Sequence, residues 1–196
     1  MALNLFIIGP SGCGKSTQAK LIAEKYGLVH LSMGQLLRDE IASASEIGLK
    51  AEFFIDNGNL VPDEIAFPIL ITNLAKINNQ NFVIDGFPRI LDQGQFVENY
   101  LAIQNHPIDL VIHLDVTFEE IMARRLARGD EFQDNDRTDN TPEAVASRQK
   151  SYDETITSIK EYFAGKKLLF EVDGNRPVEP IFEDIVTEIE RIKQNG

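Results

Sequence analysis

The sequence predicts an α/β protein in which helices flank a doubly wound parallel sheet. Short, mostly continuous apolar segments alternate along the chain with longer stretches of helical periodicity. Continuous apolar runs are typical of strands buried on both faces, and their alternation with helices is typical of crossovers between parallel strands. The chain has 196 residues, of which 43% are hydrophobic. We therefore expect one domain with its own core over residues 1–196.

Each expected strand is a short apolar run; in chain order they are Leu3–Ile8, Leu28–Leu31, Asn81–Ile84, Asp109–Val116 and Lys167–Val172. Helical periodicity fills the intervals, at about 15–26, 35–57 with a break near 44–46, 62–78, 90–104, 117–128, 141–164 and 179–194. Aromatic residues with helical neighbours, such as Phe53, Phe54 and Phe182, are expected in the core. Two stretches resemble insertions into this scheme: residues 32–61, which add helices, and residues 129–140, a polar loop.

Composition excludes several kinds of partner. A formal net charge of −12 repels polyanions, so neither a nucleic acid polymer nor an anionic membrane surface is expected as a partner. No segment approaches the roughly 20 apolar residues of a membrane span, and the first residues lack the basic region of a secretory signal. The chain's one cysteine, Cys13, excludes an internal disulfide. We expect a cytoplasmic monomer.

Residues Gly9–Ser16, with the sequence GPSGCGKS, match the phosphate-loop pattern G-x-x-x-x-G-K-[ST]. They follow an apolar strand and open a helical stretch, which is the context that this pattern requires. Glycines let backbone N–H groups turn toward a phosphate, and the helix N-terminus adds partial positive charge. We expect Lys15 to reach the β- and γ-phosphates of a triphosphate, and Ser16 or Thr17 to lie near its magnesium. The alternative is a glycine-rich turn that binds no ligand.

Asp85 ends the third apolar run, Phe82–Asp85. A carboxylate at the end of a core strand beside a phosphate loop can hold magnesium, directly or through water. The alternative for such a residue is the cap of a helix or turn. Because the chain is acidic, a phosphate site also requires basic residues gathered locally.

Six segments spread along the chain carry specific motifs: GPSGCGKSTQA at residues 9–19, HLSMGQLLR at 30–38, GNLVPDE at 58–64, DGFPR at 85–89 followed by Gln93, RTD at 137–139 followed by Arg148, and VDG at 172–174. Together these segments resemble the adenylate kinase and UMP/CMP kinase family along nearly the whole chain. The resemblance implies a phosphate-loop (P-loop) kinase fold with a five-stranded parallel sheet. It also implies an acceptor-binding insertion at 32–61 and a short lid at 129–140.

The resemblance assigns a role to each matched residue. The implied catalytic residues are Lys15, Arg89, Arg128, Arg137 and Arg148. The implied ATP site comprises Gly12, Cys13, Gly14, Lys15, Ser16, Thr17, Arg124 and Arg128, with Arg124 packing on the donor base. The implied AMP site comprises Met33, Arg38, Leu60, Val61, Gly86, Arg89, Gln93, Arg137 and Arg148, with Gln93 bonding to the adenine. Ser16 and Asp85, the latter through water, are the implied metal contacts, and Phe87–Pro88 is expected to be a cis peptide.

The activity that the resemblance implies is reversible phosphoryl transfer from Mg-ATP to AMP, which gives two ADP. Arginines suit this chemistry because a planar guanidinium binds two phosphate oxygens and keeps its proton. Met33 and Gln35 stand where these kinases commonly have threonine and aspartate, which leaves two alternatives. One is a kinase for another nucleoside monophosphate, such as UMP or CMP. The other is a nucleotide-binding regulatory protein with impaired transfer.

Overall fold

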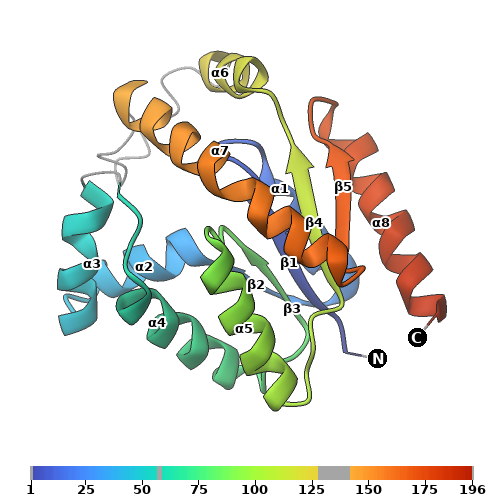
Figure 1. Cartoon of the computed structure of the whole chain (residues 1–196), viewed down its shortest axis with the longest axis horizontal. Helices are drawn as coiled ribbons and strands as arrows, with labels where there is room; N and C mark the ends of the chain where they lie inside the picture. The colour runs from blue at the N-terminus through green and yellow to red at the C-terminus, as the bar shows by residue number, and fades with distance from the viewer. Residues whose placement is uncertain (1, 57–58, 128–141, 196) are drawn as a thin grey trace.

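A five-stranded, all-parallel sheet forms the centre of the structure (Figure 1). The computed structural model describes residues 2–56, 59–127 and 142–195. The strands lie in the order β2-β3-β1-β4-β5. Their bounds are β1 Asn4–Ile8, β2 Val29–Ser32, β3 Phe82–Asp85, β4 Leu110–Asp115 and β5 Leu169–Asp173. The predicted fold class is confirmed, and each expected strand is present with its ends within two residues of the prediction.

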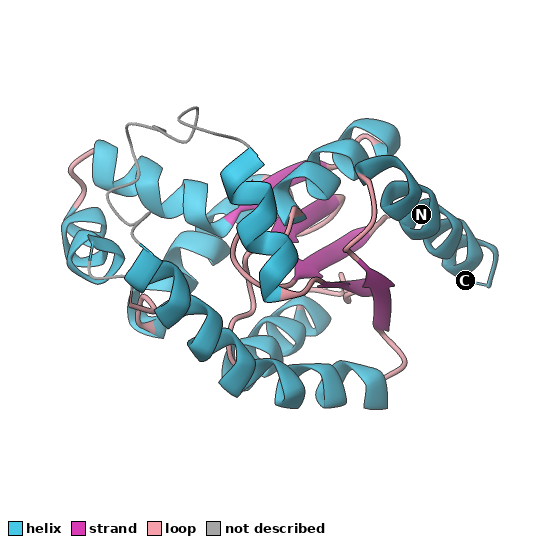
Figure 2. Ribbon diagram, turned by 90° about the horizontal axis from the view of Figure 1, so that it is seen from above, coloured by secondary structure: helices cyan, strands magenta, loops and turns pink. Residues whose placement is uncertain are grey.

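Helices cover both faces of this sheet (Figure 2). Their bounds are α1 Lys15–Tyr26, α2 Met33–Ala42, α3 Glu46–Asp56, α4 Asp63–Lys76, α5 Leu91–Ile103, α6 Phe118–Ala127, α7 Pro142–Gly165 and α8 Val178–Asn195. Helices α1 and α8 contact each other on one side, whereas α5 and α7 contact each other on the other side. Within the described residues, no helix is both long and apolar enough to span a membrane.

The strands divide the core into two apolar layers because their side chains alternate between the faces of the sheet. On β1, Phe6 and Ile8 belong to the layer that includes Leu101 of α5 and Phe163 of α7. Residues Leu5 and Ile7 belong to the layer under α1 and α8, with Ile22 and Ile185. Every residue of β1 is buried, which explains the continuous apolar run in the sequence.

The break predicted near residues 44–46 separates α2 from α3. Ala44 adopts a left-handed backbone conformation with φ 50°, and α3 then packs on α2 through a glycine. A Cβ at Gly48 would lie 2.1 Å from the backbone oxygen of Glu40, so a larger residue would force the helices apart. This packing turns Phe53 outward with 67% of its surface exposed, and the prediction that Phe53 belongs to the core is wrong. Phe54 and Phe182 are partly buried against the core, as expected.

Candidate active site

The phosphate loop leaves the carboxyl end of β1, which is the central strand. Gly9 has φ 152°, and a Cβ there would lie 2.9 Å from both Cys13 Sγ and the Leu114 carbonyl oxygen. Gly14 has φ 103° and immediately precedes α1. Glycine at these two positions therefore permits the tight path that brings the loop to the N-terminus of a helix.

The Lys15 side chain folds back onto the backbone of this loop. Its Nζ donates to the backbone oxygens of Gly9, at 2.8 Å, and Pro10, at 2.6 Å, and lies 3.7 Å from Cys13 Sγ. These acceptors are neutral, so a phosphate oxygen in the loop would offer the ammonium a stronger, charged acceptor. The lysine is thus held within the loop by bonds that a phosphate can replace.

Asp85, at the end of β3, is 4% exposed and faces the start of α1. Its carboxylate lies 2.6 Å from His30 Nε2, and it accepts a hydrogen bond from Ser32 Oγ at 3.3 Å. Burial alone would raise the pKa of Asp85, but the contacts with His30, the Lys15 charge and the Ser16 hydroxyl outweigh it and lower this pKa. The carboxylate is therefore ionised at neutral pH.

This arrangement fits a magnesium ion held mostly by its nucleotide. The described ranges contain no group of three or more His, Cys, Asp or Glu side chains able to enclose a metal. Magnesium is commonly bound by one or two protein oxygens together with waters and substrate phosphates. The Ser16 hydroxyl and the Asp85 carboxylate supply two such oxygens close to each other, beside the phosphate loop.

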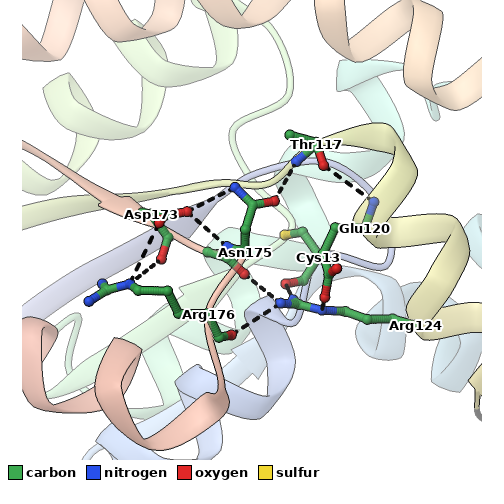
Figure 3. Close-up of polar contacts among 8 residues, drawn as sticks. Cys13, Thr117, Glu120, Arg124, Asp173, Asn175 and Arg176 are labelled. Carbon is green, nitrogen blue, oxygen red and sulfur yellow. Dashed lines mark hydrogen bonds and ion pairs between the residues drawn. The ribbon is translucent and has the colours of Figure 1, made fainter.

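A hollow of about 360 Å³ opens beside the phosphate loop on the side of α6 and α8. Arg124 of α6 forms one wall, and its guanidinium donates to the backbone oxygens of Cys13 at 3.0 Å, Gly174 at 2.6 Å and Arg176 at 3.2 Å (Figure 3). Its Nε also donates to Glu120 at 2.8 Å. Arg124 therefore joins the phosphate loop to the turn after β5 and lines the hollow, and its packing on the donor base stays a prediction.

The turn after β5 is also held by contacts with the backbone just before α6 and with a side chain of α1. Asn175 Oδ1 accepts the backbone N–H of Thr117 at 3.0 Å, and its Nδ2 donates to Asp173 at 2.8 Å (Figure 3). Gln18, a buried residue of α1, donates from Nε2 to the backbone oxygen of Val178 at 2.9 Å. The wall of the hollow is thus set by contacts that span α1, α6 and the start of α8.

On the other side of the phosphate loop, β3 leads into a second group of expected site residues. Gly86 has φ 77°, and a Cβ built there would lie 4.0 Å from both Met33 Cβ and Arg89 Nη2. Arg89 Nε donates to the Gly86 carbonyl oxygen at 3.1 Å. The expected cis peptide between Phe87 and Pro88 is confirmed. Three residues of the implied acceptor site therefore meet at the end of β3.

The other residues of the implied acceptor site differ in exposure. Met33 and Val61 are buried in the same apolar layer, whereas Leu60 is half-exposed. Gln93 is 1% exposed, and both ends of its amide have partners. Its Oε1 accepts the Arg89 backbone N–H at 2.8 Å, and its Nε2 donates to Asp63 at 2.7 Å. The hydrogen bond from Gln93 to an adenine stays a prediction, and the second N–H of Nε2 and the second lone pair of Oε1 are the groups that could form it.

The structure describes the surroundings of some of the remaining expected arginines but not of all of them. Arg38 lies on α2 and donates to Gln35 Oε1 at 2.7 Å, so the residue that replaces the usual aspartate is a direct partner of this arginine. Arg148 lies half-buried on α7. The predictions for Arg128, Arg137 and the lid at 129–140 fall outside the described residues.

His30 contacts a candidate site residue, although the sequence alone predicts no functional role for it. In the structure it is the partner of Asp85, because β2 and β3 are neighbours and pair His30 with Val83 and Ser32 with Asp85. The signal that could have identified it was the order of the strands. With β2 beside β3, polar residues at the end of β2 must face the carboxylate at the end of β3.

Fold and site together define a nucleotide-binding protein of the phosphate-loop class. The family model for adenylate kinase matches residues 7–168. The chain is 39% identical to the adenylate kinase of Azobacteroides pseudotrichonymphae genomovar. CFP2, over 97% of this chain and 98% of that protein. It is 36% identical to the adenylate kinase of Bacteroides fragilis and 33% to that of Archaeoglobus fulgidus, in each case over 97% of this chain and 100% of the other. The chain belongs to the adenylate kinase family.

Proposed function

We propose that this protein is an adenylate kinase, which transfers the γ-phosphoryl group of Mg-ATP to AMP and yields two ADP. One observation carries the proposal. The phosphate loop follows the carboxyl end of β1, and the Gly86–Arg89 segment follows the carboxyl end of its neighbour β3. The hollow adjoins the loop on the side away from β3. Ligands of open α/β sheets bind beyond the carboxyl ends of the strands. Two nucleotides bound there would meet end to end over Lys15.

The donor would bind with its base in the hollow beside Arg124 and its phosphates in the loop at 9–16. Arg124 is already anchored to three backbone oxygens, so its face can pack against a base without ordering a free side chain. Lys15 would exchange its loop carbonyls for the β- and γ-phosphates. Bound magnesium would neutralise phosphate charge, and Ser16 and, through water, Asp85 would hold it.

The acceptor would bind over Met33, Gly86 and Arg89, with Arg38 and Arg89 on its phosphate. In this proposal residues 32–61 form the acceptor-binding segment and residues 129–140 the short lid. Arg128, Arg137 and Arg148 would meet the transferring group, and closure would exclude water that otherwise hydrolyses ATP. Phosphoryl transfer depends mainly on alignment and charge neutralisation, so loss of one such arginine should cost roughly 2–4 kcal/mol of transition-state stabilisation.

The test is a coupled assay in which ATP and magnesium are offered with AMP, UMP, CMP or GMP. The proposal predicts that AMP gives the highest kcat/KM. A higher value with UMP or CMP would keep the kinase class and refute AMP as the acceptor. Nucleotide binding without transfer to any of the four acceptors would refute the kinase and favour a regulatory protein.

A further inference from the structure

His113, on β4, is a buried polar residue that the site described above does not use. It is 3% exposed, and both of its ring nitrogens have side-chain partners from other elements. Nε2 lies 2.7 Å from the Tyr152 hydroxyl on α7, and Nδ1 lies 3.2 Å from the Glu171 carboxylate on β5. The rings of His113 and Tyr152 are nearly parallel, at 18°. A buried ring with a hydrogen bond at each nitrogen is held in one orientation, and it also holds its two partners in place.

The partners determine which ring nitrogen carries the proton. An ionised carboxylate only accepts hydrogen bonds, so Nδ1–H donates to Glu171 and the Tyr152 hydroxyl donates to Nε2. Burial, followed by the Lys160 charge, lowers the pKa of His113 despite the opposing effect of Glu171. The ring is therefore neutral at pH 7, and its Nε2 is available as an acceptor.

This pair of residues lies beside the phosphate loop. In the sheet register His113 pairs with Ile8, the last residue of β1 before Gly9. The Tyr152 hydroxyl is close enough to Cys13, inside the loop, for the two groups to interact electrostatically. The hydrogen bond between His113 and Tyr152 thus joins α7 to the sheet at the place where the loop begins.

Helix α7 also carries Arg148, one turn before Tyr152. Residues four apart lie on one face of a helix, so Arg148 shares the face that Tyr152 presents to the sheet. Two turns further on, Lys160 contacts Glu171 at 2.5 Å, on the same side of α7. Contacts at Tyr152 and Lys160 fix both the position of α7 and its rotation about its own axis, and therefore the direction of Arg148.

We propose that His113 is a positioning residue for phosphoryl transfer: through Tyr152 it sets the rotation of α7 that directs Arg148 to the transferring phosphates. The inference deepens the proposed function and rests on it, because the role of Arg148 does. A small error in the placement of a guanidinium is costly, since a shift of about 1 Å can reduce turnover by as much as 100-fold.

The first test is Tyr152→Phe, which removes one hydroxyl and keeps the ring. The matched control is Tyr100→Phe on α5, whose hydroxyl donates at 3.2 Å to Asn79 in the turn that leads into β3. We expect kcat to fall about tenfold in Tyr152→Phe, with the KM for ATP and AMP changed less than twofold. The control should retain wild-type kcat. Equal kcat values in the two variants would overturn the proposal.

A double-mutant cycle separates positioning of Arg148 from a general loss of stability. If His113 and Tyr152 act through Arg148, Tyr152→Phe should lower kcat further by less than twofold in the Arg148→Ala background. If the two effects multiply, Tyr152 acts independently of Arg148 and the proposal is wrong. Wild-type protein that transfers no phosphate would instead refute the proposed function, so the two failures are distinguishable.

The pH dependence of turnover gives an independent readout. The groups that face the pair are Lys160 on α7, Glu171 on β5, Asp115 on β4 and Cys13 in the loop, with Asp153 also near Tyr152. Protonation of His113 would convert Nε2 from an acceptor into a donor and reverse the bond to Tyr152. Because the pKa of His113 is lowered, we expect wild-type kcat to fall relative to that of His113→Gln only as the pH is lowered below about 6.5, the ordinary pKa of histidine. If the ratio of wild-type kcat to His113→Gln kcat stayed constant over this pH range, the positioning role would be contradicted.

Discussion

Arg124→Lys tests whether the donor-side wall depends on the planar guanidinium or only on its charge. The two Nη atoms of Arg124 reach Cys13, Gly174 and Arg176, whereas a lysine has one nitrogen for all of them. The variant loses about two hydrogen bonds, each worth a net 0.5–1.5 kcal/mol, so the free energy of unfolding should fall by about 1–3 kcal/mol. For a chain of this length a loss of about 2 kcal/mol lowers Tm by about 4–8 °C.

The assay combines thermal unfolding with kinetics in which ATP and AMP are varied separately. Because the hollow adjoins the phosphate loop, the KM for ATP should rise at least about fivefold, which corresponds to about 1 kcal/mol, and the KM for AMP should stay within about twofold. Arg191→Lys is the control, since Arg191 lies 62% exposed in an ion pair with Glu188 and should change stability by less than about 0.5 kcal/mol. Equal Tm values for the two variants, with the KM for ATP unchanged, would show that neither the fold nor the donor site depends on the planar guanidinium of Arg124.

Three further changes test other parts of the site. Lys15→Ala should lower kcat by at least about 100-fold and lower Tm only slightly, because Nζ donates to the backbone of its own loop and Asp85 keeps its contact with His30; a large fall in Tm would contradict this. Arg89→Ala should raise the KM for AMP and lower kcat, and unchanged kinetics would remove its assigned role. Because burial lowers the pKa of His113, the unfolded state binds more protons below about pH 6.5. Wild-type Tm should therefore fall below that pH more steeply than the Tm of His113→Gln, and parallel curves would show that His113 does not cause the fall.

The sheet and its helices could be predicted from the sequence because the local signals agree with the tertiary structure. The strands are mostly apolar, and the phosphate-loop glycines mark the change from β1 to α1. The start of α2 at Met33 rather than near residue 35 was not predicted, because the end of β2 leads directly into the helix at Ser32. The exposure of Phe53 was also missed, since helical periodicity alone does not say which face of α3 is buried.

The sequence predicted which residues belong to the candidate site, but it did not predict their hydrogen-bond partners. The pattern around the phosphate loop indicates a lysine that binds phosphate, yet only the fold shows that Lys15 is held by Gly9 and Pro10. The contact between His30 and Asp85 depends on β2 lying beside β3. Likewise the bond of His113 to a residue 39 positions away depends on how α7 crosses the sheet. Such contacts follow from strand order and helix placement, which a single sequence does not encode locally.

In the proposed reaction a phosphoryl group passes directly between two nucleotides bound beyond the carboxyl ends of β1 and β3. The most direct measurement follows the γ-phosphate of labelled ATP after mixing with AMP, magnesium and the protein. We expect the label to appear in ADP as the β-phosphate of the former AMP, in a 1:1 ratio with the ATP consumed. Recovery of the label as inorganic phosphate, or its stable attachment to the protein, would contradict direct transfer.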